Sequence, residues 1–583
     1  MSLRELSRLA ELERIWVRNF KSLKDFEFSK PTRLLIVAGM NGSGKTALVE
    51  AFELLTQILE WARGLNPNPF HKWWGYDKVV WRHNEDLPII IGLKLRLGNI
   101  ESRALDTESR HVKALLEEFE NLAKDMSITY EIGASGKGGR FNVLKETLQI
   151  TAKNLQLSID TAKSVTSLEI DITKEFNDIV KSMKEFGAES KEETIKPVER
   201  GKGEYAELSQ SSILKLSIAL SDIIDLFKEV FTSKYIKENM AVLELLTNAS
   251  EIFRLASHSV RVECRLRESR SLLTIVPIIE KDIEVDASLV LYRLESFVEN
   301  TVFGDECRDH IAKVINNMIT IDSASPRYRE FVESLKGVDV NVIIERAKNA
   351  LSRHTAKEVI RRVIRIVVFA LLVVHGFIDG IAVVKNIDWK TIISPQPLTR
   401  IEKLSSDASN FLQFFFTLTG GVIGDGLKEA LRYSFPGYEN YSIVFDVTTD
   451  GRVFPSLVVD GLKLPPVSIP QGVLKTLMIE SLIIWKPTVI VIDEFENSLH
   501  PELQQFLLDE LRNSDAYVII ATHSTIPLNY AKNINEVVIL KLENGETKPY
   551  GISREALEIL KSKKLTLSEL LLSGLVRLEP KRY

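Results

Sequence analysis

The sequence predicts an α/β fold in which a mixed sheet with helices is interrupted by a large, mostly helical insertion. An apolar strand at Arg33–Ala38 is followed by a glycine-rich turn and a helix. Two more apolar strands, Thr488–Ile492 and Ala516–Ala521, lie near the other end of the chain. Strands that are apolar along their whole length are buried on both faces, as in a parallel sheet. The two ends of the chain should therefore build one domain, and the long segment between them should be inserted into it.

Residues 1–160 are predicted to supply the N-terminal half of this domain. Residues Ile15–Val37 read as two strands joined by a short turn, with Arg33–Ala38 as the second. A helix follows from about Lys45 to Arg63, because apolar residues recur along it at helical spacing. The other expected elements are a strand at Leu87–Leu97, an amphipathic helix at His111–Met126, and a hairpin of Ile128–Ile132 with Phe141–Ile150.

Residues 161–385 are predicted to form the insertion, which reads as mostly helical. It contains one expected hairpin, Ser259–Arg267 with Leu272–Glu280, and a highly charged stretch at Lys181–Lys202 that should be an exposed linker or arm. No heptad pattern is sustained over many turns, so a compact domain is expected and not a coiled-coil rod. Its longest apolar run, Ile366–Val374, falls short of the roughly 20 residues that a membrane span needs, and it predicts a buried helix.

Residues 386–583 are predicted to complete the α/β domain. Short strands return at Trp389–Ile393 and Tyr441–Val447, and a helix begins at about Pro470. The apolar strands Thr488–Ile492 and Ala516–Ala521 follow. The end of the chain reads as one strand, Glu536–Leu542, plus short helices.

Composition limits the classes of protein and partner. The chain has 583 residues, of which 45% are hydrophobic, so it can bury a large core. Its net charge of −5 excludes a basic signature over the whole chain, and any DNA site must be a local patch. Two distant cysteines without a C-x-x-C pair predict neither a zinc hook nor a disulfide framework. The charged start of the chain lacks the apolar core of a signal peptide, so a cytoplasmic protein without membrane partners is expected.

The glycine-rich turn reads Gly-Met-Asn-Gly-Ser-Gly-Lys-Thr and fits the phosphate-binding pattern G-x-x-x-x-G-K-[ST] completely. Its glycines allow a tight loop whose N–H groups point at phosphates, and the helix N-terminus adds a favourable dipole. A glycine turn that only caps a helix is the alternative, which the position between an apolar strand and a helix disfavours. The predicted nucleotide contacts are Gly39, Asn41, Gly42, Ser43, Gly44, Lys45 and Thr46. Lys45 should reach the β- and γ-phosphates of ATP, and the Thr46 hydroxyl should ligate Mg²⁺.

The apolar strand that begins at Thr488 ends in two adjacent acids, Asp493 and Glu494. Carboxylates at the end of a buried strand are costly unless they meet a cation or another partner. Asp493 suits the coordination sphere of Mg²⁺, and Glu494 suits a general base that polarises the attacking water. A pair that only caps the strand end is the alternative, and the phosphate-binding loop elsewhere in the chain disfavours it.

The next apolar strand ends in Thr522-His523-Ser524. A lone histidine is most often an ordinary surface or core residue. At a strand end that follows the acidic pair, His523 is predicted to contact the γ-phosphate and the attacking water as a third catalytic residue beside Glu494 and Lys45.

Together these segments resemble the RecF, SMC and overcoming-lysogenization-defect (OLD) type of ABC ATPase, a group of AAA-family ATP-binding heads. The resemblance covers roughly residues 1–150 and 386–583. It rests on the phosphate-binding loop and on four further segments: Ile15–Ser22 with its Asn-Phe-Lys-Ser, Val491–Glu494, Asn497–Pro501 and Ala521–Ser524. It implies an ABC-type P-loop NTPase head that binds and hydrolyses ATP with Mg²⁺.

The resemblance also implies a homodimer that sandwiches two ATP molecules, in which the signature loop of one copy closes the site of the other. The matching segment is Ser468–Thr476, where Gly472 keeps the family's glycine but Pro470 replaces its serine. Proline is tolerated in the first turn of a helix, so the Gly472 and Val473 amides could still point at a γ-phosphate. The lost hydroxyl removes a hydrogen bond of about 1.5–3 kcal/mol to a charged group, which predicts a weaker dimer or slow turnover.

Two basic patches are candidate DNA contacts. The strand from Ser259 alternates, with Arg261, Glu263, Arg265 and Arg267 on one face. A helical stripe holds Arg353, His354, Lys357, Arg361, Arg362 and Arg365. Both fit a phosphate-backbone surface, but the solvated face of a half-buried element is the favoured interpretation of each.

Three functions stay open at this stage. The first is an ATP-gated, DNA-associated ATPase in repair or anti-phage defence. The second is a nucleotide-dependent protein switch that holds a separate effector nuclease or toxin. A nuclease within the chain is not expected, because OLD-type Toprim centres need an Asp-x-Asp cluster and no Asp follows Asp515. The third is a transporter ATP-binding subunit, which the long insertion and the altered signature disfavour.

Overall fold

The computed structural model describes residues 8, 10–98, 126–152, 155–171, 259–266, 271–274, 287–303, 307–311, 360–361, 363–424, 428–429, 431–432, 441–553, 566–572 and 578–580. The chain divides into two compact units. We call Met1–Thr147, Ser271–Ala287 and Ala370–Tyr583 the head unit, and Leu148–Arg270 with Ser288–Phe369 the insertion unit. The boundaries predicted from the sequence, at residues 161 and 385, stay a prediction.

The head unit is built on a seven-stranded sheet whose order is β10-β15-β16-β3-β17-β18-β19. The strands are β10 (Ile381–Val384), β15 (Val489–Ile492), β16 (Tyr517–Ala521), β3 (Leu34–Gly39), β17 (Val537–Glu543), β18 (Glu546–Ile552) and β19 (Leu578–Pro580). The first five run parallel, and β18 and β19 are antiparallel additions, so the sheet is mixed as predicted. The four strands from β10 to β3 are apolar because both faces are covered.

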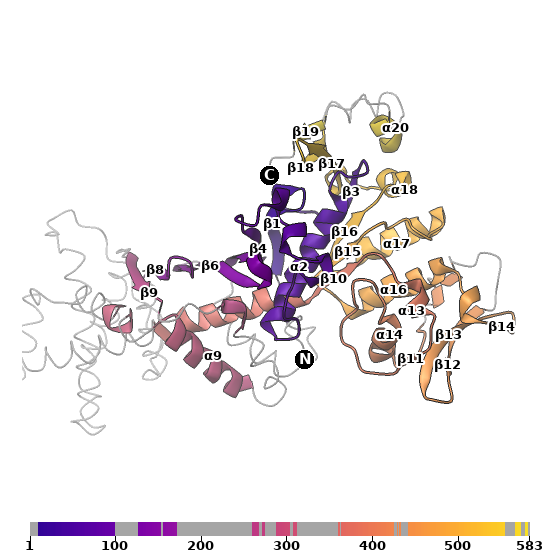
Figure 1. The fold of residues 1–583 in the computed structure, drawn as a ribbon, viewed down its shortest axis with the longest axis horizontal. Coiled ribbons are helices and arrows are strands. Elements are labelled where there is room, and N and C mark those ends of the chain that lie inside the picture. The colour runs from indigo at the N-terminus through magenta and orange to yellow at the C-terminus, as the bar shows by residue number, and fades with distance from the viewer. Residues whose placement is uncertain are drawn as a thin grey trace, which may run out of the picture. The chain divides into compact units, whose positions relative to one another are not determined.

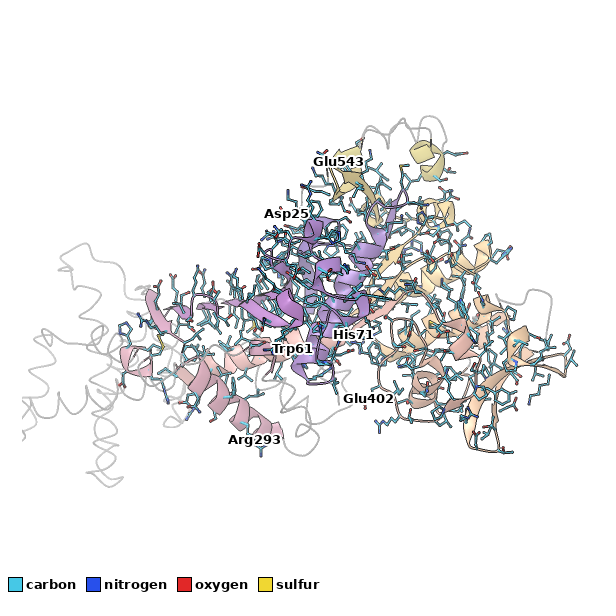
Figure 2. All side chains as sticks on the ribbon, viewed as in Figure 1. Asp25, Trp61, His71, Arg293, Glu402 and Glu543 are labelled. Atoms are coloured by element: carbon cyan, nitrogen blue, oxygen red, sulfur yellow. A yellow bond between two sulfur atoms is a disulfide. The ribbon has the colours of Figure 1, made fainter. Side chains whose placement is uncertain are left out.

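Helices and loops from both ends of the chain cover this sheet (Figure 1). The apolar core includes residues of α14 (Phe411–Thr419), α16 (Gln471–Trp485) and α17 (Pro501–Asn513). Phe411, Phe414 and Phe415 are among its largest fully buried side chains. Figure 2 shows how densely side chains fill the space around the sheet. Residues 366–374 are buried within a helix, as predicted. In the described part of the chain, no helix is long and apolar enough to cross a membrane.

A second sheet of the head unit has the order β2-β1-β4-β5-β6, and its strands from β2 to β5 pair antiparallel. Its strands are β1 (Ala10–Phe20), β2 (Leu23–Ser29), β4 (Ile89–Leu97), β5 (Ser127–Ser135) and β6 (Asn142–Ala152), the last of which continues into the insertion unit. The hairpin of β5 with β6 agrees with the sequence prediction. A small third sheet joins β11 (Gln396–Pro397), β12 (Tyr441–Val447), β13 (Arg452–Val459) and β14 (Leu462–Leu464).

Two local predictions for the head unit are wrong. Residues 15–37 hold parts of three strands and not two, because Asn19 and Lys21 adopt left-handed backbone and turn β1 tightly into β2. Residues Trp389–Ile392 form the short helix α13 and not a strand. The Asp388 side chain accepts a hydrogen bond from the Thr391 amide and so caps this helix, a local signal that was present in the sequence.

In the insertion unit, β7 (Leu155–Asp160), β8 (Val165–Asp171) and β9 (Ser259–Arg265) form an antiparallel set, and α9 (Ala287–Thr301) is its longest described helix. The strand predicted from Ser259 is confirmed as β9. Its side chains alternate between the two faces as predicted, with Val262 and Cys264 buried and Glu263 and Arg265 exposed. Its predicted partner is wrong: β9 pairs with β8, and Leu272–Thr274 forms a turn of 3₁₀ helix. Arg293 is exposed on α9 (Figure 2).

Several sequence predictions lie outside the described residues. They include the helix predicted at 111–126, the charged stretch at 181–202 and residue 267 of the basic patch. Of the basic helical stripe, only Arg361 and Arg365 have described side chains. Arg361 is exposed, whereas Arg365 donates a hydrogen bond to the Glu295 carboxylate at 2.8 Å.

Cys264 and Cys307 of the insertion unit are joined by a disulfide, with their Cα atoms 5.4 Å apart. The prediction that the cysteines form no disulfide is therefore wrong. Spacing alone could not show the pair, because 43 residues separate the two positions and only the folded unit brings them together. Since disulfides are rare in reducing cytosol outside hyperthermophiles, the cytoplasmic assignment stays a prediction.

Reduction of this disulfide is expected to destabilise the insertion unit. The bond closes a segment of 43 residues, and a loop of that length restricts the unfolded chain enough to contribute about 2–4 kcal/mol. Urea unfolding of wild-type protein with and without reductant, beside Cys264→Ser, measures this. Reductant should bring the wild type to the level of the variant and leave the variant unchanged. Identical unfolding of all samples would contradict the prediction.

Candidate nucleotide site

The predicted site residues gather at one edge of the parallel sheet. In parallel strands the carboxyl ends lie on the same side, and ligands bind there in open α/β sheets. Register places Ile492 of β15 beside Ile520 of β16, and Ile520 beside Ile36 of β3. The segments 39–46, 493–494 and 522–523, which follow these strands, therefore emerge at one edge, with β16 between the other two strands (Figure 1).

The loop from Gly39 to Thr46 forms a cradle that only glycine permits at two points. A Cβ at Gly39 would lie 2.5 Å from the Leu540 carbonyl oxygen. A Cβ at Gly44, whose φ is +99°, would lie 2.0 Å from Thr547 Oγ1. The Ser43 hydroxyl is buried here without a hydrogen-bond partner. A tight glycine-rich cradle with an unsatisfied buried hydroxyl fits the phosphate chain of a nucleotide.

A brace beneath this loop was missed by the sequence reasoning. The Thr547 hydroxyl on β18 donates to the Ser43 carbonyl at 2.9 Å and lies 2.7 Å from the Ser22 hydroxyl. The Thr547 amide donates to the Ser22 carbonyl at 2.8 Å. Ser22 was already singled out in the Asn-Phe-Lys-Ser segment, but nothing in the sequence connects it with a threonine near the other end of the chain.

Lys45 begins α2 (Lys45–Ala62) and curls back over the loop. Its ammonium donates to the carbonyls of Gly39 at 2.8 Å and Met40 at 3.1 Å. Burial lowers the pKa of Lys45, and the charges of Asp493 and Glu496 oppose that effect. The cation is thus fixed within the loop, where a phosphate would be its natural counter-ion.

Thr46 and Asp493 meet across the sheet edge. The Thr46 hydroxyl lies close enough to the Asp493 carboxylate to affect its pKa. Burial raises the pKa of Asp493, and the nearby charges of Glu494 and Glu50 add to that, while the Thr46 hydroxyl opposes it. A crowded carboxylate of this kind favours a bound cation. The oxygen pair of Thr46 and Asp493 fits Mg²⁺, which takes few protein ligands beside phosphates and water.

Glu494 follows Asp493 and is exposed, with its backbone in the left-handed region at φ 47°. The Asn497 side-chain amide donates a hydrogen bond to its carboxylate. Left-handed backbone is uncommon for residues with a Cβ and concentrates at functional sites. The side chain therefore stands at the strand end with a fixed direction, as a general base requires.

His523 is exposed, and the Glu496 carboxylate holds its backbone by a hydrogen bond. The Glu496 carboxylate accepts hydrogen bonds from the Thr522 hydroxyl and the His523 amide, both at 2.7 Å. None of the sequence motifs contains Glu496, although it lies only two residues beyond Glu494. The loop after β15 and the segment after β16 are thereby locked together.

The signature-like segment differs in detail from its prediction. Pro470 is the N-cap of α16 and not part of its first turn. The Val473 amide donates to the Pro470 carbonyl at 3.0 Å, so its predicted use toward a phosphate is wrong in this conformation. Gly472 packs closely on the loop after β15, since a Cβ there would lie 2.5 Å from the Ser498 carbonyl oxygen.

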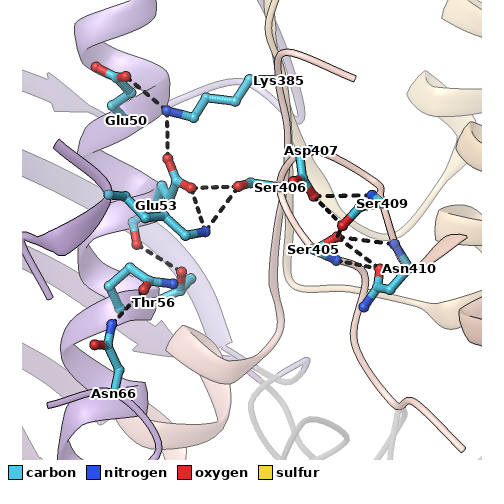
Figure 3. A network of polar contacts seen from close by, with 12 residues as sticks. Glu50, Glu53, Thr56, Asn66, Lys385, Ser405, Ser406, Asp407, Ser409 and Asn410 are labelled. Carbon is cyan, nitrogen blue, oxygen red and sulfur yellow. Dashed lines mark hydrogen bonds and ion pairs between the residues drawn. The ribbon is translucent and has the colours of Figure 1, made fainter. Parts of the chain in front are cut away.

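A buried ionic network fixes α2 to the end of β10 (Figure 3). Lys385 binds the carboxylates of Glu50 at 2.8 Å and Glu53 at 2.7 Å. Burial lowers the pKa of Lys385, but the two glutamates outweigh it and raise that pKa overall. Lys21 and Lys72 add ion pairs to Glu50 and Glu53, respectively. The sequence signal for this network is that Glu50 and Glu53 fall on the inner face of an amphipathic helix, where buried acids need a partner.

This network stands beside the acidic strand end. The Asp493 amide donates to the Val384 carbonyl at 2.9 Å, immediately before Lys385. The sequence alone identified no glutamine in the Q-loop role of the family. The residues that follow β10 are Lys385 and Asn386, so no glutamine occupies this strand end.

Glu480→Gln is expected to stabilise the head unit at pH 8 but not at pH 5. Burial on α16, with the charge of Glu510 adding to it, raises the pKa of Glu480 from 4.5 to about 7. Between these values the unfolded chain has lost this proton and the folded protein keeps it, so stability falls as pH rises and then stays level above about 7. At about 1.4 kcal/mol per pKa unit, the cost approaches about 3 kcal/mol.

Thermal unfolding of wild type and Glu480→Gln at both pH values measures the effect. Glu510→Gln, which removes only the neighbouring charge, should show a smaller gain in the same direction at pH 8. A gain of equal size at both pH values would show that ionisation of Glu480 is not the cause.

Comparisons with known proteins agree with this geometry. Residues 409–528 match a family model described as "AAA domain, putative AbiEii toxin, Type IV TA system". A relative named "Putative ABC transporter ATP-binding protein", from Caldanaerobacter subterraneus subsp. tengcongensis, is 32% identical over 106 residues. That match covers 18% of this chain, and the chain spans 41% of the length of this relative.

Solved Smc heads are similar at low sequence identity. An Smc head bound to the C-winged helix domain of ScpA has 8% identity and a TM-score of 0.36, covering 94% of this chain and 99% of that chain. An Smc head with a coiled coil and joint from Pyrococcus yayanosii has 13% identity and a TM-score of 0.33, covering 95% and 100%. TM-scores this low leave the fold to be judged from the strand order itself. The match to an AAA domain over residues 409–528 and the match to a relative named as an ATP-binding protein agree with a P-loop NTPase head built from the loop, strand ends and parallel sheet described above.

Proposed function

We propose that the head unit binds ATP with Mg²⁺ and hydrolyses it to ADP and phosphate. The observation that carries this is the meeting, at one sheet edge, of the phosphate-binding loop, Thr46, Asp493, Glu494 and His523. The curated relative that the chain matches is named as an ATP-binding protein. Its partial coverage leaves the whole activity a proposal.

Each residue has a chemical role in this proposal. The loop amides and Lys45 hold the β- and γ-phosphates, and Thr46 with Asp493 holds the metal ion. When bound, Mg²⁺ supplies charge neutralisation on the phosphate oxygens. Glu494 accepts a proton from the attacking water, and His523, fastened through Glu496, donates to the γ-phosphate side.

We propose further that two copies close over two ATP molecules through Gly472, with hydrolysis opening them again. Pro470 has no hydroxyl to offer a γ-phosphate and the Val473 amide is already bonded, so the dimer should be weak or its turnover slow. Light scattering with Glu494→Gln and ATP measures this. A tight dimer at ordinary ATP concentrations would contradict it.

The proposed setting is action on DNA, in repair or anti-phage defence. The observation behind this setting is that Arg265 is exposed on β9, next to the exposed Glu263. Changing Arg261, Arg265 and Arg267 to Glu should remove DNA binding. Undiminished binding would show that this strand is only a solvated sheet face.

The second candidate is a nucleotide-dependent switch that holds a separate effector. The matched family description names a "putative AbiEii toxin" of a "Type IV TA system", and that observation favours a setting in which the chain works with a toxin or antitoxin partner. ATP turnover with and without duplex DNA, beside Glu494→Gln, separates the candidates. Turnover that rises with DNA and vanishes in the variant supports the DNA-associated ATPase. Turnover indifferent to DNA supports the switch, and ATP binding without turnover contradicts hydrolysis itself.

A further inference from the structure

Lys475 is a buried lysine that contacts the loop after β15, and its relative exposure is 1%. It lies on α16, about one turn after Gly472. Its ammonium donates to the backbone carbonyls of Glu494 at 2.9 Å, Phe495 at 3.0 Å and Asn497 at 3.0 Å. An ammonium has three N–H donors, and all three are used on this one loop. These three bonds therefore hold the backbone of the loop, and none of them goes to another side chain.

The loop that receives these bonds has an unfavourable backbone. Glu494 and Ser498 both have positive φ, at 47° and 66°, although neither is glycine. Conformations of this kind persist only where surrounding contacts hold them. Lys475 supplies three such contacts between the two strained positions.

The same loop is connected on both sides. Toward the start of α16, the Ser498 hydroxyl donates to the Gln471 side chain at 2.9 Å, and the Ser498 carbonyl packs against Gly472. Toward the neighbouring strand, Glu496 accepts from Thr522 and from the His523 amide. A shift of α16 therefore reaches Glu494 directly through Lys475, and it reaches His523 through Glu496 of the same loop.

We propose that Lys475 is a positioning residue that holds the loop carrying Glu494 and ties this base to helix α16. The proposal rests on the proposed function of Glu494. Its consequence is a coupling within one copy of the chain. In the proposed dimer, a nucleotide contact at the start of α16, where Gly472 lies, would act through Lys475 on the base that serves the other nucleotide.

The ionisation of Lys475 gives this role a signature. Burial lowers its pKa to about 8, although the charges of Glu496, Glu494 and Asp493 oppose that. Deprotonation near pH 8 removes the positive charge and one of the three N–H donors. The hold on the loop should therefore weaken as pH rises through this value, whereas an arginine at the same position would stay charged.

The experiment compares wild type with Lys475→Met, Lys475→Arg and the matched control Glu480→Gln, which is buried on the same helix. Lys475→Met should lower the kcat for ATP by about 10- to 100-fold, as a misplaced catalytic group does. Its Kd for ATP should stay within about threefold, because Lys475 touches no loop that holds phosphate. Lys475→Arg should restore most of the kcat, and Glu480→Gln should leave it unchanged.

The pH profile of kcat separates positioning from mere stability. Wild type should lose activity with a descending limb near pH 8, and this limb should be absent in Lys475→Arg. An unchanged kcat in Lys475→Met, or the same limb in Lys475→Arg, would overturn the proposal. So would a loss of kcat matched by an equal loss of ATP affinity.

Hydrogen exchange of the amides of residues 495–499 tests the hold on the loop without turnover. Exchange there should quicken by at least about tenfold in Lys475→Met and stay near wild type in Lys475→Arg. If wild type showed no turnover, hydrolysis would be refuted, while this exchange result would still decide whether Lys475 holds the loop. Equal exchange in all three proteins would show that Lys475 does not hold this loop.

Discussion

Glu494→Gln is expected to lower ATP turnover by about 10²–10⁴-fold while ATP still binds within a few-fold of wild type. The substituted amide would keep the shape of the side chain and could still bond Asn497, which contacts the Glu494 carboxylate. It cannot accept a proton from water. Because the side chain is exposed and none of the phosphate-loop contacts involves it, neither folding nor binding should change.

Steady-state phosphate release and equilibrium binding of ATP, measured on the same preparation, check this expectation. Glu510→Gln on α17 is the matched control, since it removes a carboxylate of the head unit away from the strand end and should leave turnover unchanged. Turnover within about fivefold of wild type in Glu494→Gln would remove Glu494 from the role of base.

Gly44→Ala is expected to weaken ATP binding by about 10- to 100-fold, equivalent to losing one hydrogen bond to a charged group. The new methyl would lie 2.0 Å from Thr547 Oγ1 and 2.8 Å from Ser22 Oγ. The backbone at φ +99° is also unfavourable for any residue with a Cβ. Thr547 cannot simply rotate away, because its hydroxyl is bonded to the Ser43 carbonyl. The loop must therefore move, and its N–H groups then no longer point at the phosphates.

Gly42→Ala separates the steric clash from the backbone strain. Gly42 has φ +77°, but a Cβ there would meet nothing within 4 Å. It should therefore weaken ATP binding less than Gly44→Ala does. The double variant Gly44→Ala with Thr547→Ala removes the clashing hydroxyl and should recover part of the affinity. Isothermal titration with ATP measures all three, and equal losses in Gly42→Ala and Gly44→Ala would show that the contact with Thr547 is irrelevant.

The sequence by itself determined the local elements that carry chemistry. The phosphate-binding loop, the acidic pair and His523 each follow a short apolar strand, and all three strands are present. Local patterns of this kind work because a buried parallel strand must be apolar throughout, and because a phosphate loop needs glycines at fixed spacing. The α/β fold class followed from the same runs. The alternation in β9 also predicted its faces correctly, since side chains alternate along every strand.

Only the tertiary structure decided which distant residues meet. The brace of Ser22 with Thr547, the grip of Lys475 on the loop after β15 and the disulfide of Cys264 with Cys307 join positions with no shared local pattern. The partner of β9 was wrong for the same reason, because alternation sets the faces of a strand but not its neighbour. Periodicity reports the local environment of a residue, whereas partners depend on how the whole chain packs. The elements of the site could therefore be read from the sequence, and the contacts that hold Glu494 and His523 in place could not.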